Sequence, residues 1–259
     1  MVLASDPDKV IAKQGTLQDD SASGLDFRPI ALLSTDYKLF TRVLANRLRP
    51  MLPRIVHPLQ TRFVPGRDIH STIDVFLALQ REERVKPSSE ACVLLLDFSK
   101  AYDTLRRDHL LAALKHAGLL ARFRTLVDAL HDGTSAVFLV NGFPSSRLAV
   151  TRGIRQGCPL APLRFILALN PLYQRLCSDR AINGLMRTPS SLGNHAITVS
   201  GFADDTALYL RDAPSVRRAM AVLDHFGEES GLVINRSKSI VIRLGVPEEQ
   251  LEDLHLKVL

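Results

Sequence analysis

Three aspartates lie in surroundings that favour chemistry: Asp97 and the adjacent pair Asp204 and Asp205. The pair interrupts the otherwise uncharged stretch 197–210, whose Ile, Val, Thr and Tyr side chains predict a β-hairpin with the acids at its turn. Adjacent carboxylates repel each other, and a divalent cation such as Mg2+ relieves that repulsion, because carboxylates and substrate phosphates are its usual ligands. A solvated Asp-Asp turn without chemistry is the alternative, and the pair alone does not decide between them.

Asp97 directly follows a short apolar run, residues 91–96, that has no polar alternation. Such a run predicts a strand buried on both faces. If this strand neighbours the hairpin, the three carboxylates meet at one end of a single antiparallel sheet with helices on its other face. Two metal ions held in such a place stabilise the attacking and leaving oxygens of a phosphoryl transfer. The sequence therefore predicts a two-metal site at this sheet end.

Apolar residues at helical spacing predict the helices that must position these strands. The second helix is predicted from the i, i+4, i+7 spacing of Ile69, Ile73, Phe76, Leu77 and Gln80. Capping residues, glycines and prolines set the helix ends. The predicted helices cover about residues 36–49, 69–86, 105–116, 120–131, 160–178 and 212–231. Strands are predicted at 91–96, in a 135–150 hairpin around Asn141 and Gly142, at 197–210 and within 232–244.

The composition is that of a globular protein. With 259 residues and 46% hydrophobic side chains, the chain can bury a sizeable core, as one large domain or two packed subdomains. The three cysteines form no Cys-x-x-Cys pair, which argues against a disulfide framework or a zinc ribbon and favours an intracellular setting, nucleus or cytoplasm. No apolar run approaches the roughly 20 residues that span a bilayer, so we expect no membrane partner.

Positive charge is concentrated in one segment of a chain whose net charge is +6. Residues 28–67 hold eight basic residues and a single acid, Asp36. Such a segment attracts polyanions, nucleic acid first among them, while a solvated basic helix face explains the charge equally well. The basic residues are Arg28, Lys38, Arg42, Arg47, Arg49, Arg54, Arg62 and Arg67.

A series of motifs resembles that of the reverse transcriptases of non-LTR (LINE-type) retrotransposons, in order and in spacing. The motifs are Leu94–Asp103 (LLLDFSKAYD), Arg152–Leu160 (RGIRQGCPL), Phe202–Asp205 (FADD) and Gly231–Lys238 (GLVINRSK). Arg28–Leu33, Tyr37–Leu39 and the loop Gln60–Arg67 resemble fingers motifs of the same family, so the resemblance covers about residues 26–245.

The resemblance implies an α+β right-hand polymerase with fingers and palm, and with the thumb essentially missing. It also implies an RNA or DNA template, a primer 3′-hydroxyl, deoxynucleoside triphosphates (dNTPs) and two Mg2+ ions, with Mn2+ as a substitute. The oligomeric state is left open. The implied parts are a flexible leader (1–25), a fingers-like basic helical region (26–90), a palm with residual fingers elements (91–245) and a truncated, helical start of the thumb (246–259).

Residue by residue, the resemblance assigns metal binding to Asp97, Asp204 and Asp205, with the main-chain carbonyl of Phe98 as a further ligand. Nucleotide binding falls to Tyr102, Gln156, Gly157, Lys238, Arg67 and Arg28. Tyr102 is expected to disfavour a 2′-hydroxyl and, with Gln156, to border the same cleft as the aspartates. The alternatives are structural: a core aromatic for Tyr102, a loop residue for Gln156 and solvent-facing charges for the basic residues.

Three departures from the family pattern favour a second hypothesis. First, family members usually carry Gly-Asp-Pro-Leu-Ser-Pro at residues 157–162, where this chain has Cys158 in place of Asp and Ala161 in place of Ser. Second, they usually carry an apolar residue where this chain has Arg164. Third, they usually carry a glycine where it has Arg62. A catalytically inactive, truncated remnant of a retroelement that only binds nucleic acid is therefore the alternative to an active RNA-directed DNA polymerase.

Overall fold

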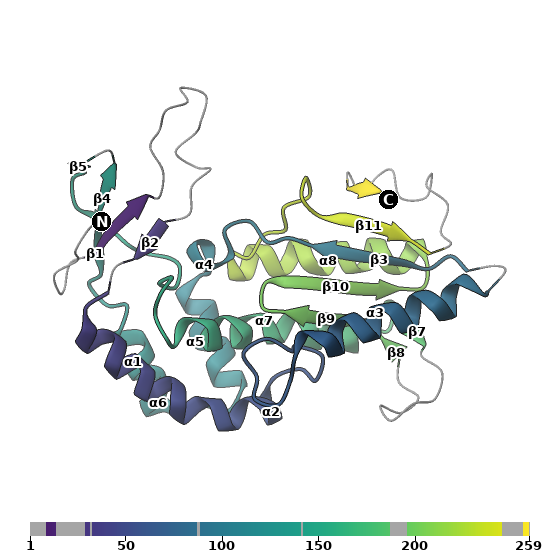
Figure 1. Ribbon diagram of the computed structural model, residues 1–259, viewed down its shortest axis with the longest axis horizontal. Coiled ribbons are helices and arrows are strands. Elements are labelled where there is room, and N and C mark those ends of the chain that lie inside the picture. Colours follow the sequence, from purple (N-terminus) through teal and green to yellow (C-terminus); the bar gives the residue numbers. More distant parts are fainter. Residues whose placement is uncertain are drawn as a thin grey trace. The chain divides into compact units, whose positions relative to one another are not determined.

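The computed structural model describes residues 9–13, 29–31, 33–86, 89–140, 142–186, 196–244 and 256–258 (Figure 1). The chain divides into two compact units, and each is described by itself. The first consists of residues 1–50 and 102–165, and the second of residues 51–101 and 166–259. Within the described ranges, no helix combines the length and apolar character that crossing a bilayer requires.

The second unit is built on a five-stranded sheet in the order β12-β11-β3-β10-β9. Every pair is antiparallel except β11 with β12, which confirms the predicted antiparallel sheet. In Figure 1, α8 runs along one face of this sheet, and it contacts β10. The strands are β3 (Cys92–Leu96), β9 (Val199–Phe202), β10 (Asp205–Leu210), β11 (Ile240–Arg243) and β12 (Lys257–Val258), with β7 (Leu185–Met186) and β8 (Ala196–Ile197) in a separate pair.

Capping residues set the ends of two helices in the second unit. Asp68 and Asp212 cap α3 and α8 by accepting hydrogen bonds from the main chain three residues on, and Gly231 ends α8 in the left-handed conformation at φ 78°. The helices are α2 (Leu52–Ile55), α3 (Ile69–Arg84), α8 (Ala213–Ser230) and most of α7 (Ala161–Ser178), which starts in the first unit.

The first unit combines a second sheet with short helices. Strand β4 pairs in parallel with β1 and antiparallel with β5 and β6, and β1 also pairs with β2. The strands are β1 (Lys9–Lys13), β2 (Pro29–Ala31), β4 (Ser135–Val140), β5 (Phe143–Pro144) and β6 (Leu148–Ala149). The helices are α1 (Thr35–Leu48), α4 (Ala101–Thr104), α5 (Arg107–His116) and α6 (Ala121–Ala129), and the 3-10 turn η2 (Arg49–Met51) follows α1 at Pro50.

The structure refines the predictions for two elements. Of the apolar residues whose spacing predicted α3, Phe76 packs partly buried against the core cluster of Val75, Leu79 and Val93, whereas Ile69, Ile73 and Leu77 are exposed. Strand β3 is not buried on both faces, since the side chain of Leu95 is 38% exposed.

Two predictions at the chain ends also differ from the structure. Part of the predicted flexible leader forms strand β1, because Val10, Ile11 and Ala12 supply an apolar run that pairs with β2 and β4. Of the predicted helical start of the thumb, only residues 256–258 are described, and they include strand β12. The rest of both segments lies outside the described residues, as does Asn141 of the predicted turn.

Arg164 is fully buried in the first unit, although the sequence departs from the family there. Its guanidinium contacts Nε2 of His131, and Nη2 donates to Sγ of Cys158 at 3.7 Å. Cys158 and His131 are themselves buried. Two of the three departures, Cys158 and Arg164, are therefore in direct contact.

His131 should make stability depend on pH. Burial, together with the charges of Arg164 and Arg107, lowers the pKa of His131 to about 3 from an ordinary value of 6.5. Between these values the unfolded chain binds a proton that the folded chain excludes, so stability is lost as the pH falls below 6.5. We expect a loss of up to about 1.4 kcal/mol per pH unit from this site, measured by urea unfolding at pH 7, 6 and 5.

The matched variant is His131→Gln, which keeps a hydrogen-bond acceptor and cannot titrate. Its stability should fall less steeply with acidification than that of the parent chain. A residual slope is expected from His57, since burial and the charge of Arg67 lower its pKa to about 4. Equal slopes for the two proteins would contradict this role of His131.

Candidate active site

Strand pairing brings the three aspartates to one end of the second unit's sheet. Leu96 pairs with Thr206 across β3 and β10, and the next position of this register sets Asp97 opposite Asp205. Asp205 pairs with Phe202 across β9 and β10, which leaves Ala203 and Asp204 as a two-residue turn. The aspartates thus meet where the sequence predicted, and their roles as ligands stay a prediction.

A cavity of about 410 Å3 opens at this sheet end. Asp97, Asp205 and Lys238 line it together, so the structure also brings the predicted lysine to two of the predicted acids. Asp204 lies next to Asp205 in the turn. The other lining residues are Thr72, Leu95, Leu96, Ser200, Phe202, Thr206 and Ala207.

The donor set fits Mg2+ when part of the coordination comes from elsewhere. In the described part of the chain, no group of three or more His, Cys, Asp or Glu side chains is arranged to hold a metal by itself. Mg2+ does not require such a cage, because it commonly takes one or two carboxylates, several waters and substrate phosphates. Asp97 and Asp205, with Asp204 beside them, supply this minimal set of oxygens.

The turn that carries Asp204 has an unfavourable backbone conformation. Ala203 lies at φ 63°, and Asp204 is not in the left-handed region, a combination typical of a type II′ hairpin turn, which favours glycine at its first position. A side chain there costs on the order of 1 kcal/mol or more. The carboxamide of Gln60 meets both polar groups of Ala203: Oε1 accepts from the amide at 2.9 Å, and Nε2 donates to the carbonyl at 3.1 Å.

Gly201 in β9 allows a close approach from two sides. A Cβ atom at this position would lie 2.0 Å from Oη of Tyr173 and 2.9 Å from Nε2 of Gln60. The Tyr173 hydroxyl lies 2.9 Å from Oγ1 of Thr206, and burial raises the pKa of Tyr173 well above its ordinary value. Sequence reasoning missed this group, although a glycine inside a strand pattern is a signal of close approach.

Asp97 is held through its main chain. Its amide donates to Oγ of Ser239 at 3.1 Å, and its carbonyl accepts from the amide of Asn235 at 2.7 Å. Oγ of Ser239 in turn donates to the carbonyl of Asn235 at 2.8 Å. Phe98 forms an isolated antiparallel bridge with Ile234, and its carbonyl as a metal ligand stays a prediction.

Arg67 has a different environment from the one expected of a phosphate clamp. Its two terminal nitrogens donate to four main-chain carbonyls, those of His57 at 2.7 Å, Gln60 at 2.8 Å, Pro53 at 3.1 Å and Val56 at 3.5 Å. In this conformation the guanidinium links main-chain carbonyls of the 53–60 segment. Phosphate binding by Arg67 stays a prediction, because it requires these hydrogen bonds to break. Arg28 lies outside the described residues.

Tyr102, Gln156 and Gly157 belong to the first unit. The Tyr102 ring stacks on Phe165 at a centroid distance of 4.9 Å, and its carbonyl accepts from the amide of Ile154 at 2.7 Å. Gly157 takes φ 92°, which favours glycine. The structure thus links Tyr102 to the loop that carries Gln156. That both residues border the cavity of the aspartates stays a prediction.

Arg62, the third departure, lies beside the hairpin. Its guanidinium sits 4.6 Å from the ring centroid of Phe202 and 4.9 Å from that of Phe63. Such cation–π contacts fix an arginine without a carboxylate. Since Phe202 also lines the cavity, Arg62 adds positive charge near the acids.

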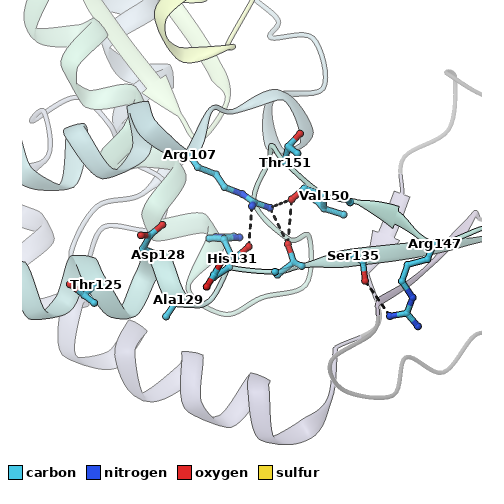
Figure 2. A pocket seen from close by; sticks show the side chains of 13 residues that line it. Arg107, Thr125, Asp128, Ala129, His131, Ser135, Arg147, Val150 and Thr151 are labelled. Atoms are coloured by element: carbon cyan, nitrogen blue, oxygen red, sulfur yellow. Dashed lines mark hydrogen bonds between the residues drawn. The ribbon is translucent and has the colours of Figure 1, made fainter.

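A larger cavity, of about 870 Å3, lies in the first unit. Figure 2 shows Arg107 reaching across it, where its guanidinium donates to the carbonyls of His131 and Val150 and to Oγ1 of Thr134. The bonds join the end of α6 to the strands that follow. Its described lining includes none of the residues predicted for catalysis.

Comparison with known proteins places these features in context. A family model described as "Reverse transcriptase (RNA-dependent DNA polymerase)" matches residues 13–252. The transposon TX1 uncharacterized 149 kDa protein of Xenopus laevis is 30% identical over 214 residues, which is 83% of this chain and 16% of that protein. The retrovirus-related Pol polyprotein from type-1 retrotransposable element R2 of Popillia japonica is 29% identical over 237 residues, which is 90% of this chain and 31% of the polyprotein.

The chain therefore spans about a sixth of the first of these relatives and about a third of the second. Among solved structures, apo telomerase from Candida tropicalis aligns with a TM-score of 0.63 at 10% identity, covering 94% of this chain and 46% of that chain. At this identity the likeness shows a common polymerase fold and no more.

Gly201→Ala should destabilise the second unit, because the new methyl group would overlap Oη of Tyr173. Overpacking of this kind typically costs about 1–3 kcal/mol, which denaturant unfolding would measure. The control is the same substitution in a Tyr173→Phe background, where Oη is absent while Cζ, which would lie 2.9 Å from the new Cβ, remains. The cost should be smaller there than in the parent chain, and an equal cost would show that the contact with the Tyr173 hydroxyl is not the cause.

Proposed function

Because this chain belongs to the reverse transcriptase (RNA-dependent DNA polymerase) family, we propose that it is the RNA-directed DNA polymerase domain of a non-LTR retrotransposon. The reaction is nucleotidyl transfer from a dNTP to a primer 3′-hydroxyl on an RNA or DNA template. The observation that supports it most is the shared cavity of Asp97, Asp205 and Lys238 beside the turn of Asp204.

In this proposal, Asp97, Asp204 and Asp205 hold two Mg2+ ions, or Mn2+ in their place, and Phe98 contributes its carbonyl. When bound, the ions neutralise charge on the triphosphate and activate the primer hydroxyl. Lys238, exposed at the cavity, places an ammonium where it neutralises the leaving group or donates a proton to it.

The remaining predicted residues act on the nucleotide and the nucleic acid. Tyr102 lies under the sugar, Gln156 and Gly157 contact the nucleotide and template through the loop that joins Tyr102, and Arg67 and Arg28 bind phosphate. Residues 91–245, which hold the acids and strands β3, β9, β10 and β11, form the palm in this proposal. The free cysteines Cys92, Cys158 and Cys177 fit an intracellular setting.

Primer extension on an RNA template with Mg2+ tests the proposal. Asp97→Asn, Asp204→Asn and Asp205→Asn should each lower incorporation at least about 100-fold, because a lost metal ligand removes several kcal/mol of charge stabilisation. Asp224→Asn is the matched control on the surface of α8, where Asp224 pairs with Arg236 at 2.9 Å. It should change incorporation by less than about twofold, since exposed ion pairs contribute little.

The same preparations decide the alternative of an inactive remnant. Template binding that weakens with salt, without extension and without any effect of Asp204→Asn, would favour a chain that only binds nucleic acid. Equal incorporation by the parent chain and all three asparagine variants would refute the assignment of the catalytic residues.

A further inference from the structure

The turn between β9 and β10 needs support from outside the hairpin. Its first residue is Ala203, an alanine at φ 63° where glycine is the favoured residue. Neighbouring Asp204 and Asp205 carry like charges, which adds to the cost of a tight turn. A change of conformation at Ala203 would redirect both carboxylates, since they follow it directly in the chain.

Gln60 provides this support with a single side chain. Oε1 accepts from the Ala203 amide at 2.9 Å while Nε2 donates to the Ala203 carbonyl at 3.1 Å. The pair of bonds spans both peptide groups that flank the Ala203 Cα, so it opposes rotation about φ and ψ of this residue. A carboxamide supplies the donor and the acceptor together without any change of protonation.

Gln60 is itself immobilised. It is 1% exposed and forms a parallel bridge with Gly201, where the Gly201 amide donates to the Leu59 carbonyl and the Thr61 amide donates to the Gly201 carbonyl, both at 2.9 Å. The Gln60 carbonyl accepts from Arg67 at 2.8 Å. The absence of a side chain at Gly201 leaves room for Nε2, which would lie 2.9 Å from a Cβ atom there.

We propose that Gln60 is a positioning residue, whose carboxamide holds Ala203 in the left-handed conformation and so aims Asp204 and Asp205 at the metal ions. This inference rests on the proposed function for its catalytic consequence. The hydrogen-bond geometry on which it stands is independent of that function.

The test uses Gln60→Met, which keeps the length of the side chain and removes both hydrogen bonds to Ala203. It also removes the bonds of the carboxamide to the Arg62 amide at 3.2 Å and to the Tyr173 hydroxyl at 3.5 Å. Gln80→Met on α3 is the matched control. Two quantities are measured on the full chain: Mn2+ affinity by electron paramagnetic resonance and nucleotide incorporation by primer extension. Gln60→Met should lower both by roughly 10- to 100-fold, as is usual for groups that orient metal ligands. A residue with only a packing role would leave Mn2+ affinity at the level of the control.

A second background separates positioning from a general loss of structure. In Ala203→Gly chains the left-handed conformation carries no steric cost, so adding Gln60→Met should have a much smaller effect than in the parent background. Equal losses in the two backgrounds, or an unchanged Mn2+ affinity in Gln60→Met, would overturn the proposal.

The remaining outcomes are also decisive. If circular dichroism shows that Gln60→Met does not fold, Gln60→Asn replaces it, since its carboxamide is one methylene too short to reach both groups of Ala203. If the parent chain incorporates no nucleotide, the proposed polymerase function fails, and the Mn2+ affinities still test Gln60. If the parent chain binds no Mn2+, both proposals fail.

Discussion

The pairing of β3 with β10 is the interaction on which the candidate site depends, because it brings Asp97 and Asp205 together from distant parts of the sequence. Both partners are anchored through their main chains by loops from elsewhere in the second unit. Ser239 and Asn235 hold the peptide groups of Asp97, and Gln60 holds the turn ahead of Asp205. The acids are thus positioned through hydrogen bonds to the main chain at or next to them.

Much of this arrangement was predictable from local sequence. The apolar run before Asp97 and the β-prone flanks of Asp204 and Asp205 predicted the strands. The pairing of β3 with β10, in the register that sets Asp97 opposite Asp205, comes from the structure. The start of α8 at Asp212 and its end at Gly231 were also predicted, since they depend on neighbouring residues alone, whereas the cap of α3 at Asp68 was not. The hairpin and its acids are therefore the part of the site that sequence determines most directly.

The supports of the site were not predictable in the same way. Gln60 lies in a loop rich in basic residues, and those residues predict phosphate binding rather than support of a turn. Its partner Ala203 is also far from it in the sequence. Arg67 shows the same difficulty: an arginine predicts an anion, whereas four carbonyl groups surround it here. Spacing predicted that α3 is a helix but did not show which of its apolar residues meet the sheet: Phe76 packs against the core cluster, whereas Ile69, Ile73 and Leu77 are exposed.

The contact between Cys158 and Arg164 has a consequence for how this chain is compared with its relatives. Considered separately, Cys158 and Arg164 are two independent departures from the family pattern near the start of a helix. Because the side chains are in contact and buried, the effect of either residue on stability depends on the other. A relative that carries only one of them lacks this contact. Substitutions at the two sites should therefore have non-additive effects on stability and belong together in any comparison with relatives.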